Sequence, residues 1–191
     1  MSKHDRHLLD LSSLTILVAD DNDVMRSTFK QLLRTYGARK IFEAHEGAEA
    51  LQQIEERAID ILITNWDMRP IDGIETVRIL RRHPVAEKQM MPVIMVSAHS
   101  TPRNVRYARD CGVNEFLTKP VAPIDLYLRL EEIILRPRAF IKCPSYIGPD
   151  RHRHDGRRYS GPKRRVQDQG KGQNGETAAE PASKPAKEAS A

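Results

Sequence analysis

The chain has 191 residues, and its 31 lysines and arginines against 26 aspartates and glutamates give a formal net charge of +5. This length allows one compact domain with a substantial appendage. No apolar run is long enough to span a membrane, the first ten residues lack a signal-peptide core, and two cysteines are too few for a disulfide scaffold. We therefore expect a cytoplasmic protein.

The positive charge is confined to one segment. Residues 1–135 carry 18 basic and 20 acidic groups, residues 136–165 carry 10 and 2, and residues 166–191 carry 3 and 4. A basic segment of this kind indicates a local binding function rather than a basic domain.

Short apolar runs alternate with stretches of helical spacing between residues 13 and 135. The predicted strands are residues 14–19, 41–44, 60–65, 92–98 and 115–118. The predicted helices are residues 23–36, 46–57, 74–82, 102–111 and 123–135. Five strands alternating with five helices predict an α/β fold in which helices cover both faces of a parallel sheet.

The composition changes after residue 135. Residues 136–165 contain eight arginines, four prolines and three glycines without a sustained apolar period. Residues 166–191 are rich in polar and small residues, which is typical of disorder. We predict a folded domain at 13–135, an arginine-rich extension at 136–165 and a disordered tail at 166–191.

Several polar residues are expected at the carboxyl ends of the predicted strands, where open α/β sheets bind ligands. Asp20 and Asp21 end the first strand, Ser97 lies near the end of the fourth, and Lys119 follows the fifth. Two acids beside a hydroxyl and an ammonium group are suited to Mg²⁺ and a phosphoryl group.

The motifs that carry these residues resemble those of the response-regulator receiver domains, the CheY-like family. They are LVADD at residues 17–21, NWDMRPIDG at 65–73, VSA at 96–98 and FLTKP at 116–120. The resemblance implies a flavodoxin-like five-stranded sheet. It also implies a phosphoryl-accepting aspartate at the end of the third strand, next to Mg²⁺.

The resemblance assigns a role to each matching residue. Asp20 and Asp21 match the metal-binding acids, and Lys119 matches the phosphate-contacting lysine. Ser97 matches the switch hydroxyl, and Phe116 matches the aromatic switch position, although it lacks the hydroxyl of a tyrosine.

The phosphoacceptor position itself holds Asn65, counted back from Asp72 and Gly73. A carboxamide cannot form an acyl phosphate, and its loss of charge lowers the affinity for Mg²⁺. We therefore expect no catalytic residue, no enzymatic activity and only weakened Mg²⁺ binding at Asp20 and Asp21. The alternative is a conventional phosphorylated receiver that tolerates Asn65.

The arginine-rich extension has features suited to a guanine nucleotide. Arginine favours planar, bidentate contacts with phosphates and with guanine O6 and N7. Arg153 and Arg157 form an R-x-x-x-R element with Asp155 between them, a spacing that resembles the arginine element of PilZ-type cyclic di-GMP receptors. Asp155 can accept from the Watson–Crick edge of guanine, and Tyr146 or Tyr159 can stack on a base.

A receiver without its acceptor, followed by this extension, resembles the CheY-like cyclic di-GMP effectors (Cle proteins). The resemblance implies that cyclic di-GMP replaces phosphorylation, and that the receiver then docks on the flagellar motor switch, with recruitment to the motor or the cell pole. The candidate ligand-binding residues are Tyr146, Ile147, Arg151, Arg153, Asp155, Arg157, Arg158 and Tyr159. We expect residues 145–165 to be disordered when free and to fold around the ligand. A nucleic-acid binder that uses the basic segment is the remaining alternative.

Overall fold

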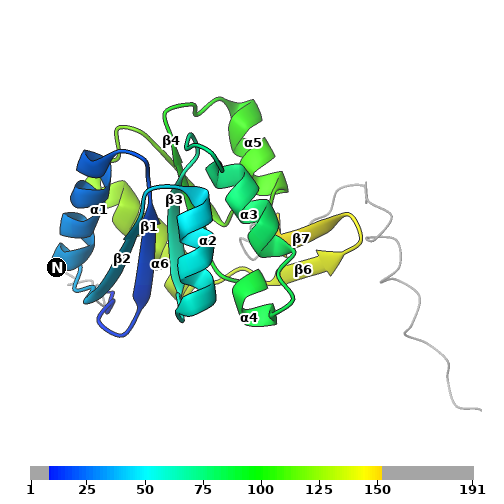
Figure 1. Cartoon of the computed structure of the whole chain (residues 1–191), viewed down its shortest axis with the longest axis horizontal. Helices are drawn as coiled ribbons and strands as arrows, with labels where there is room; N and C mark the ends of the chain where they lie inside the picture. Colours follow the sequence, from blue (N-terminus) through cyan, green and yellow to red (C-terminus); the bar gives the residue numbers. More distant parts are fainter. Residues whose placement is uncertain (1–8, 152–191) are drawn as a thin grey trace, which may run out of the picture. The chain divides into compact units, whose positions relative to one another are not determined.

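A computed structural model of the chain describes residues 9–151 (Figure 1). Five parallel strands form one sheet in the order β2-β1-β3-β4-β5. These strands are β1 (Thr15–Ala19), β2 (Lys40–Ala44), β3 (Ile61–Asn65), β4 (Val93–Ser97) and β5 (Glu115–Thr118). The predicted flavodoxin-like sheet is confirmed, and each predicted strand is found to within one residue at either end.

Within residues 9–151, six helices connect or follow these strands. They are α1 (Asp23–Thr35), α2 (Gly47–Glu56), α3 (Gly73–Arg81), α4 (Ala86–Gln89), α5 (Pro102–Asp110) and α6 (Pro123–Leu135). The prediction of five helices was wrong by one, because the single turn α4 lies in a segment too short to show a helical period.

The core consists of two apolar layers, one on each face of the sheet. Ile16 and Val18 of β1 pack in the layer under α1 and α6, whereas Leu17 and Ala19 pack in the layer under α2, α3 and α5. This alternation follows from the two-residue period of a strand. Every residue of β1, β3 and β4 is buried, as expected for central strands covered on both faces.

Two leucines before the predicted domain boundary at residue 13 also belong to this core. Leu9 and Leu11 are buried in the layer under α1 and α6, and the backbone N–H of Leu9 donates to the Tyr127 hydroxyl at 3.3 Å. The described fold therefore includes the segment that leads into β1.

The first part of the arginine-rich extension is an antiparallel hairpin. Strands β6 (Phe140–Cys143) and β7 (Tyr146–Pro149) pair across a two-residue turn at Pro144 and Ser145. The expectation of disorder from residue 145 onward was wrong for residues 145–151. Two short strands with aromatic and β-branched residues gain enough from packing against the domain to be ordered. Residues 152–191, including the predicted disordered tail, lie outside the described residues.

Arg81 connects the hairpin to the domain. Its buried guanidinium donates to the carbonyl oxygens of Gln89, Met91 and Gly112 at 2.8 to 3.0 Å. It also lies over the Phe140 ring, 4.9 Å from the centroid. Burial lowers the pKa of Arg81 to about 10, so these acceptors compensate an otherwise costly buried charge.

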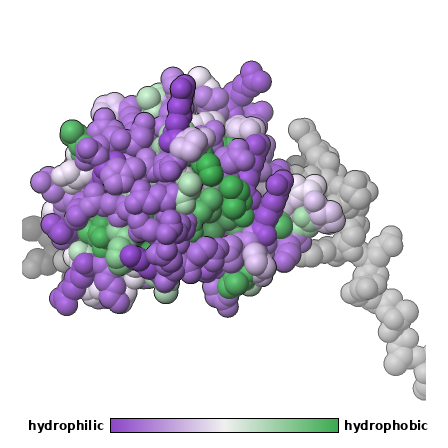
Figure 2. All heavy atoms as spheres, in the orientation of Figure 1, coloured by the Kyte–Doolittle hydropathy of each residue, from purple (hydrophilic) through white to green (hydrophobic). Residues whose placement is uncertain are grey.

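The outer face over α2 and α3 is mainly hydrophilic, with apolar side chains gathered in its middle (Figure 2). Within residues 9–151, no helix is long and apolar enough to cross a membrane.

Candidate functional site

Asp20 and Asp21 follow β1 at the carboxyl edge of the sheet. Asp20 is buried and Asp21 is exposed. The backbone N–H of Asn22 donates to Asp20 Oδ1 at 3.0 Å, while the Asn22 side chain caps α1 by accepting from the N–H groups of Val24 and Met25. The start of α1 therefore holds the first acid in place.

Lys119 and Ser97 complete this edge, as predicted. Lys119 Nζ forms an ion pair with Asp20 Oδ2 at 2.9 Å, and its backbone N–H donates to the Ser97 carbonyl at 2.9 Å. Ser97 is fully buried at the end of β4, where its hydroxyl accepts from the N–H of His99 at 3.0 Å. We call Asp20, Asp21, Asn65, Ser97 and Lys119 the carboxylate pocket.

Asn65 ends β3 between these groups and is buried. Its amide nitrogen donates to Asp21 Oδ1 at 3.1 Å and to the carbonyl oxygen of Asp67 at 2.7 Å. Gly73 permits this packing, because a Cβ atom there would lie 2.1 Å from the Asn65 carbonyl oxygen. The side chain thus occupies the position that the motif assigns to the phosphoacceptor.

The donor set of this pocket does not fit a resident Mg²⁺ ion. Lys119 already pairs with Asp20, and Asn65 presents an N–H group, not a carboxylate oxygen, to Asp21. Within the described part of the chain, no group of three or more His, Cys, Asp or Glu side chains could hold a metal. Mg²⁺ requires several hard oxygen ligands in near-octahedral geometry, which two acids with these partners do not supply.

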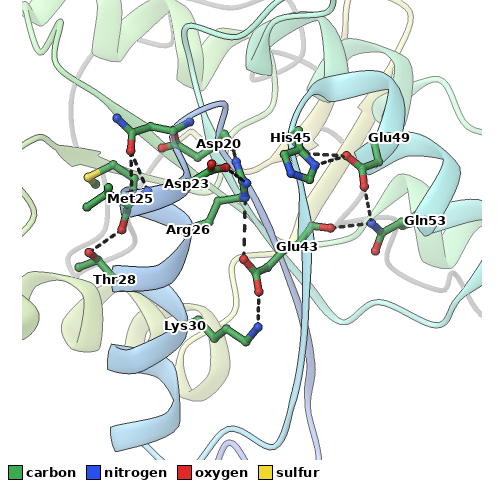
Figure 3. A network of polar contacts seen from close by, with 12 residues as sticks. Asp20, Asp23, Met25, Arg26, Thr28, Lys30, Glu43, His45, Glu49 and Gln53 are labelled. Atoms are coloured by element: carbon green, nitrogen blue, oxygen red, sulfur yellow. Dashed lines mark hydrogen bonds and ion pairs between the residues drawn. The ribbon is translucent and has the colours of Figure 1, made fainter.

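A polar network joins the pocket to the adjacent helices and strand (Figure 3). The buried Arg26 of α1 donates to the Asp20 carbonyl at 2.6 Å and forms ion pairs with Asp23 and Glu43. Glu43 also pairs with Lys30. Sequence reasoning could find Asn22 as a helix cap, but it missed Arg26, because an arginine on a surface helix carries no sign of burial.

Phe116 lies in a cluster of aromatic rings next to the pocket. The Trp66 ring, which follows Asn65, packs edge-on against Phe116 at 6.3 Å and stacks on Tyr107 of α5 at 6.0 Å. Packing among these rings joins the end of β3 to α5 and β5.

The hairpin brings together two of the predicted ligand-binding residues. The Arg151 guanidinium lies 3.8 Å from the Tyr146 ring centroid and forms an ion pair with Asp110 at 3.3 Å. The Tyr146 hydroxyl donates to the carbonyl oxygens of Pro149 at 2.7 Å and Arg109 at 3.4 Å. Burial raises the pKa of Tyr146, in accord with a hydroxyl held as a donor.

The other candidates have different positions. Ile147 lies in β7, where its carbonyl oxygen faces Gly112. The remaining predicted ligand-binding residues, Arg153, Asp155, Arg157, Arg158 and Tyr159, lie outside the described residues.

The hairpin and the carboxylate pocket lie at opposite ends of β5. Arg138, which leads into the hairpin, donates to the carbonyl of Asn114 and pairs with Glu115, the first residue of β5. Lys119 follows the last residue of the same strand. The hairpin and the carboxylate pocket are therefore separate.

The fold and these motifs match known proteins. The family model described as "Response regulator receiver domain" matches residues 16–131. The chain belongs to this family. Receiver domains are signalling domains, so a role in signalling follows.

The relatives come from chemotaxis. The chain is 31% identical over 124 residues to the chemotaxis protein CheY-3 of Vibrio cholerae, covering 65% of this chain and 94% of that protein. It is 33% identical over 125 residues to the chemotaxis protein CheY of Pseudomonas aeruginosa, covering 64% and 98%. A solved Francisella receiver domain has a TM-score of 0.59 at 29% identity and covers 65% of this chain and 99% of its own. The arginine-rich extension lies beyond the family match.

Proposed function

We propose that this receiver is a binding module whose input is cyclic di-GMP instead of a phosphoryl group. The observation that carries the proposal is the hydrogen bond from Asn65 to Asp21, which fills the acceptor position with an amide. An amide oxygen is a poor nucleophile, and the pocket lacks the third carboxylate that would help to hold Mg²⁺. The input must therefore arrive elsewhere, and the arginine-rich extension is the part of the chain suited to an anionic ligand.

The hairpin supports a role of the extension in ligand recognition. Stacking on Tyr146 and pairing with Asp110 hold Arg151 in a defined position, two residues before the R-x-x-x-R element. A preorganised arginine reduces the ordering cost of binding compared with a wholly flexible segment. The remaining candidate residues would then become ordered around the nucleotide, and their arginines would contact its phosphates and guanine edges. These residues are Arg153, Asp155, Arg157, Arg158 and Tyr159.

The partner that we propose is the flagellar motor switch. The relatives are named as chemotaxis proteins, and the receiver-family resemblance assigns output to the face made here by α5, β5 and α6. Arg151 contacts the last residue of α5, and Arg138 contacts the first residue of β5. Ligand binding at the extension is thus positioned to act on that face without the carboxylate pocket.

A comparison of the two inputs on the full chain tests this function. Thermal unfolding is followed with cyclic di-GMP and, separately, with acetyl phosphate plus Mg²⁺. We expect stabilisation by cyclic di-GMP alone. A phosphoryl adduct on the wild-type chain would instead support the conventional phosphorylated receiver. Binding of DNA or RNA that is indifferent to guanine and falls steeply with salt would support the nucleic-acid alternative.

A further inference from the structure

A cavity of about 410 Å³ lies where the hairpin meets the output face. Four arginines line it from four segments: Arg109 of α5, Arg129 of α6, Arg138 before β6 and Arg151 after β7. The wall also contains Asn114 and Glu115, together with four apolar residues, namely Val105, Ala108, Val113 and Phe116. We call this cavity the arginine pocket.

The arginine pocket has a surplus of positive charge. Arg109 and Arg151 share one carboxylate, that of Asp110, at 3.7 and 3.3 Å. Arg129 and Arg138 likewise share Glu115, at 3.4 and 3.3 Å. Among the described residues, four guanidinium groups thus face two carboxylates, so these six side chains carry two net positive charges in a partly buried place, where an anion is attracted more strongly than at an open surface.

Three of these guanidinium groups also have donors without acceptors. The Nε atoms of Arg109, Arg129 and Arg151 are buried and have no hydrogen-bond partner among the described residues. A buried donor without a partner is costly, and a guanidinium presents its N–H groups as a fork that matches two oxygens of a phosphate. A small rotation of each side chain toward a bound oxyanion would satisfy these donors.

We propose that the arginine pocket binds the phosphate groups of an organic phosphate. The two surplus charges match two phosphodiester groups or one diphosphate, and the apolar wall suits the sugar or base beside them. The volume lies in the range of small-ligand sites. The phosphates belong either to cyclic di-GMP held by the extension, a source that rests on the proposed function, or to a separate phosphate compound.

Calorimetric titration of the full chain tests the pocket, with pyrophosphate and cyclic di-GMP as separate probes. The double variant R109Q/R129Q removes two pocket arginines that lie outside the extension. The control R103Q/R106Q removes the same charge from exposed positions of α5. We expect R109Q/R129Q to weaken pyrophosphate binding by about tenfold or more, and the control by no more than about twofold. Equal losses of pyrophosphate affinity in both variants, or no pyrophosphate binding by the wild type, would overturn the proposal that the arginine pocket binds phosphate.

Prior saturation with cyclic di-GMP separates the two sources. If cyclic di-GMP supplies the phosphates, it blocks pyrophosphate binding, and R109Q/R129Q also weakens its own binding. If pyrophosphate binds equally well before and after saturation, the pocket takes a separate phosphate compound. Pyrophosphate binding with no cyclic di-GMP binding would refute the proposed function but would still support the proposal that the arginine pocket binds phosphate groups.

A substitution that should tighten pyrophosphate binding provides a second test, because misfolding of a variant can only weaken binding. Asp110→Asn removes the carboxylate that Arg109 and Arg151 share, so pyrophosphate binding should tighten several-fold. The control Asp125→Asn removes an exposed acid of α6 that does not line the pocket. Equal effects of the two substitutions on pyrophosphate affinity would mean that binding depends only on the net charge of the protein, and would overturn the proposal.

Discussion

The side-chain amide of Asn65 donates a hydrogen bond to the carboxylate of Asp21 across the carboxyl edge of the sheet, at 3.1 Å. An aspartate in the same place would set two carboxylates against each other and would require a cation between them. The amide replaces that repulsion with an attraction. The hydrogen bond therefore joins the end of β3 directly to the segment that follows β1.

Restoring the acid should reverse this relationship. Asn65→Asp should lower the free energy of unfolding at neutral pH by about 1–2 kcal/mol without metal, because a hydrogen bond is exchanged for repulsion. Mg²⁺ should restore this stability, and acetyl phosphate should then give a phosphoryl adduct by intact mass. Equal responses of the wild type and the variant to Mg²⁺ would show that the amide is not what excludes the ion.

The ion pair between Lys119 and Asp20 should stabilise the fold. The Asp20 carboxylate is 2% exposed and the Lys119 side chain 21%, so Lys119→Met leaves a buried charge with the N–H of Asn22 as its main donor. We expect a loss of about 3 kcal/mol in urea unfolding. The control is Lys40→Met at an exposed position of β2. Equal free energies of unfolding for Lys119→Met and Lys40→Met would contradict this account.

Gly112 offers a test of how firmly the hairpin packs. Its φ of +99° disfavours any side chain, and a Cβ atom there would lie 2.9 Å from the Ile147 carbonyl oxygen and 3.0 Å from Arg81 Cγ. Gly112→Ala should cost about 3 kcal/mol. Gly37 is the matched control, because its φ is +92° and a Cβ atom there would meet nothing within 4 Å. Gly37→Ala should cost only about 1 kcal/mol. Equal costs would mean that the hairpin is not packed on Gly112.

The free energy of unfolding should decrease in alkaline solution because the Tyr146 hydroxyl ionises. Burial raises the pKa of its hydroxyl, so the unfolded chain releases this proton at a lower pH than the folded chain does. The contribution is therefore complete below about pH 10 and is lost as the pH rises further. Tyr146→Phe should cost about 1 kcal/mol at neutral pH, through the lost hydrogen bond to Pro149, and should flatten the alkaline decline. Denaturant unfolding of both proteins at about pH 8 and about pH 10.5 measures the difference. Parallel declines would refute the assignment to Tyr146.

The sequence was sufficient for the sheet and for the carboxylate pocket. Buried parallel strands appear in the sequence as continuous apolar runs, and the carboxyl ends of such strands meet at one edge of the sheet. The sequence alone therefore predicts that four residues lie at this edge, namely Asp20, Asn65, Ser97 and Lys119. The loss of the acceptor at Asn65 was visible for the same reason.

The hairpin and the arginine pocket could not be predicted in this way. The strands β6 and β7 have four residues each, too few for a period to emerge from a segment rich in proline and arginine. Arg81 and Arg138 resemble ordinary surface arginines in the sequence, and only tertiary packing shows that they hold the hairpin against the domain. The arginine pocket draws on four separate segments, which no local pattern can relate.

The central claim is that cyclic di-GMP is the input, and calorimetric titration of this nucleotide into the full chain at physiological salt tests it most directly. The account predicts binding to the wild type and weaker binding to Asp155→Ala, even though the substitution makes the extension more basic, because the proposed role of this carboxylate is to accept from the Watson–Crick edge of guanine. No binding by the wild type, or tighter binding by Asp155→Ala, would contradict it.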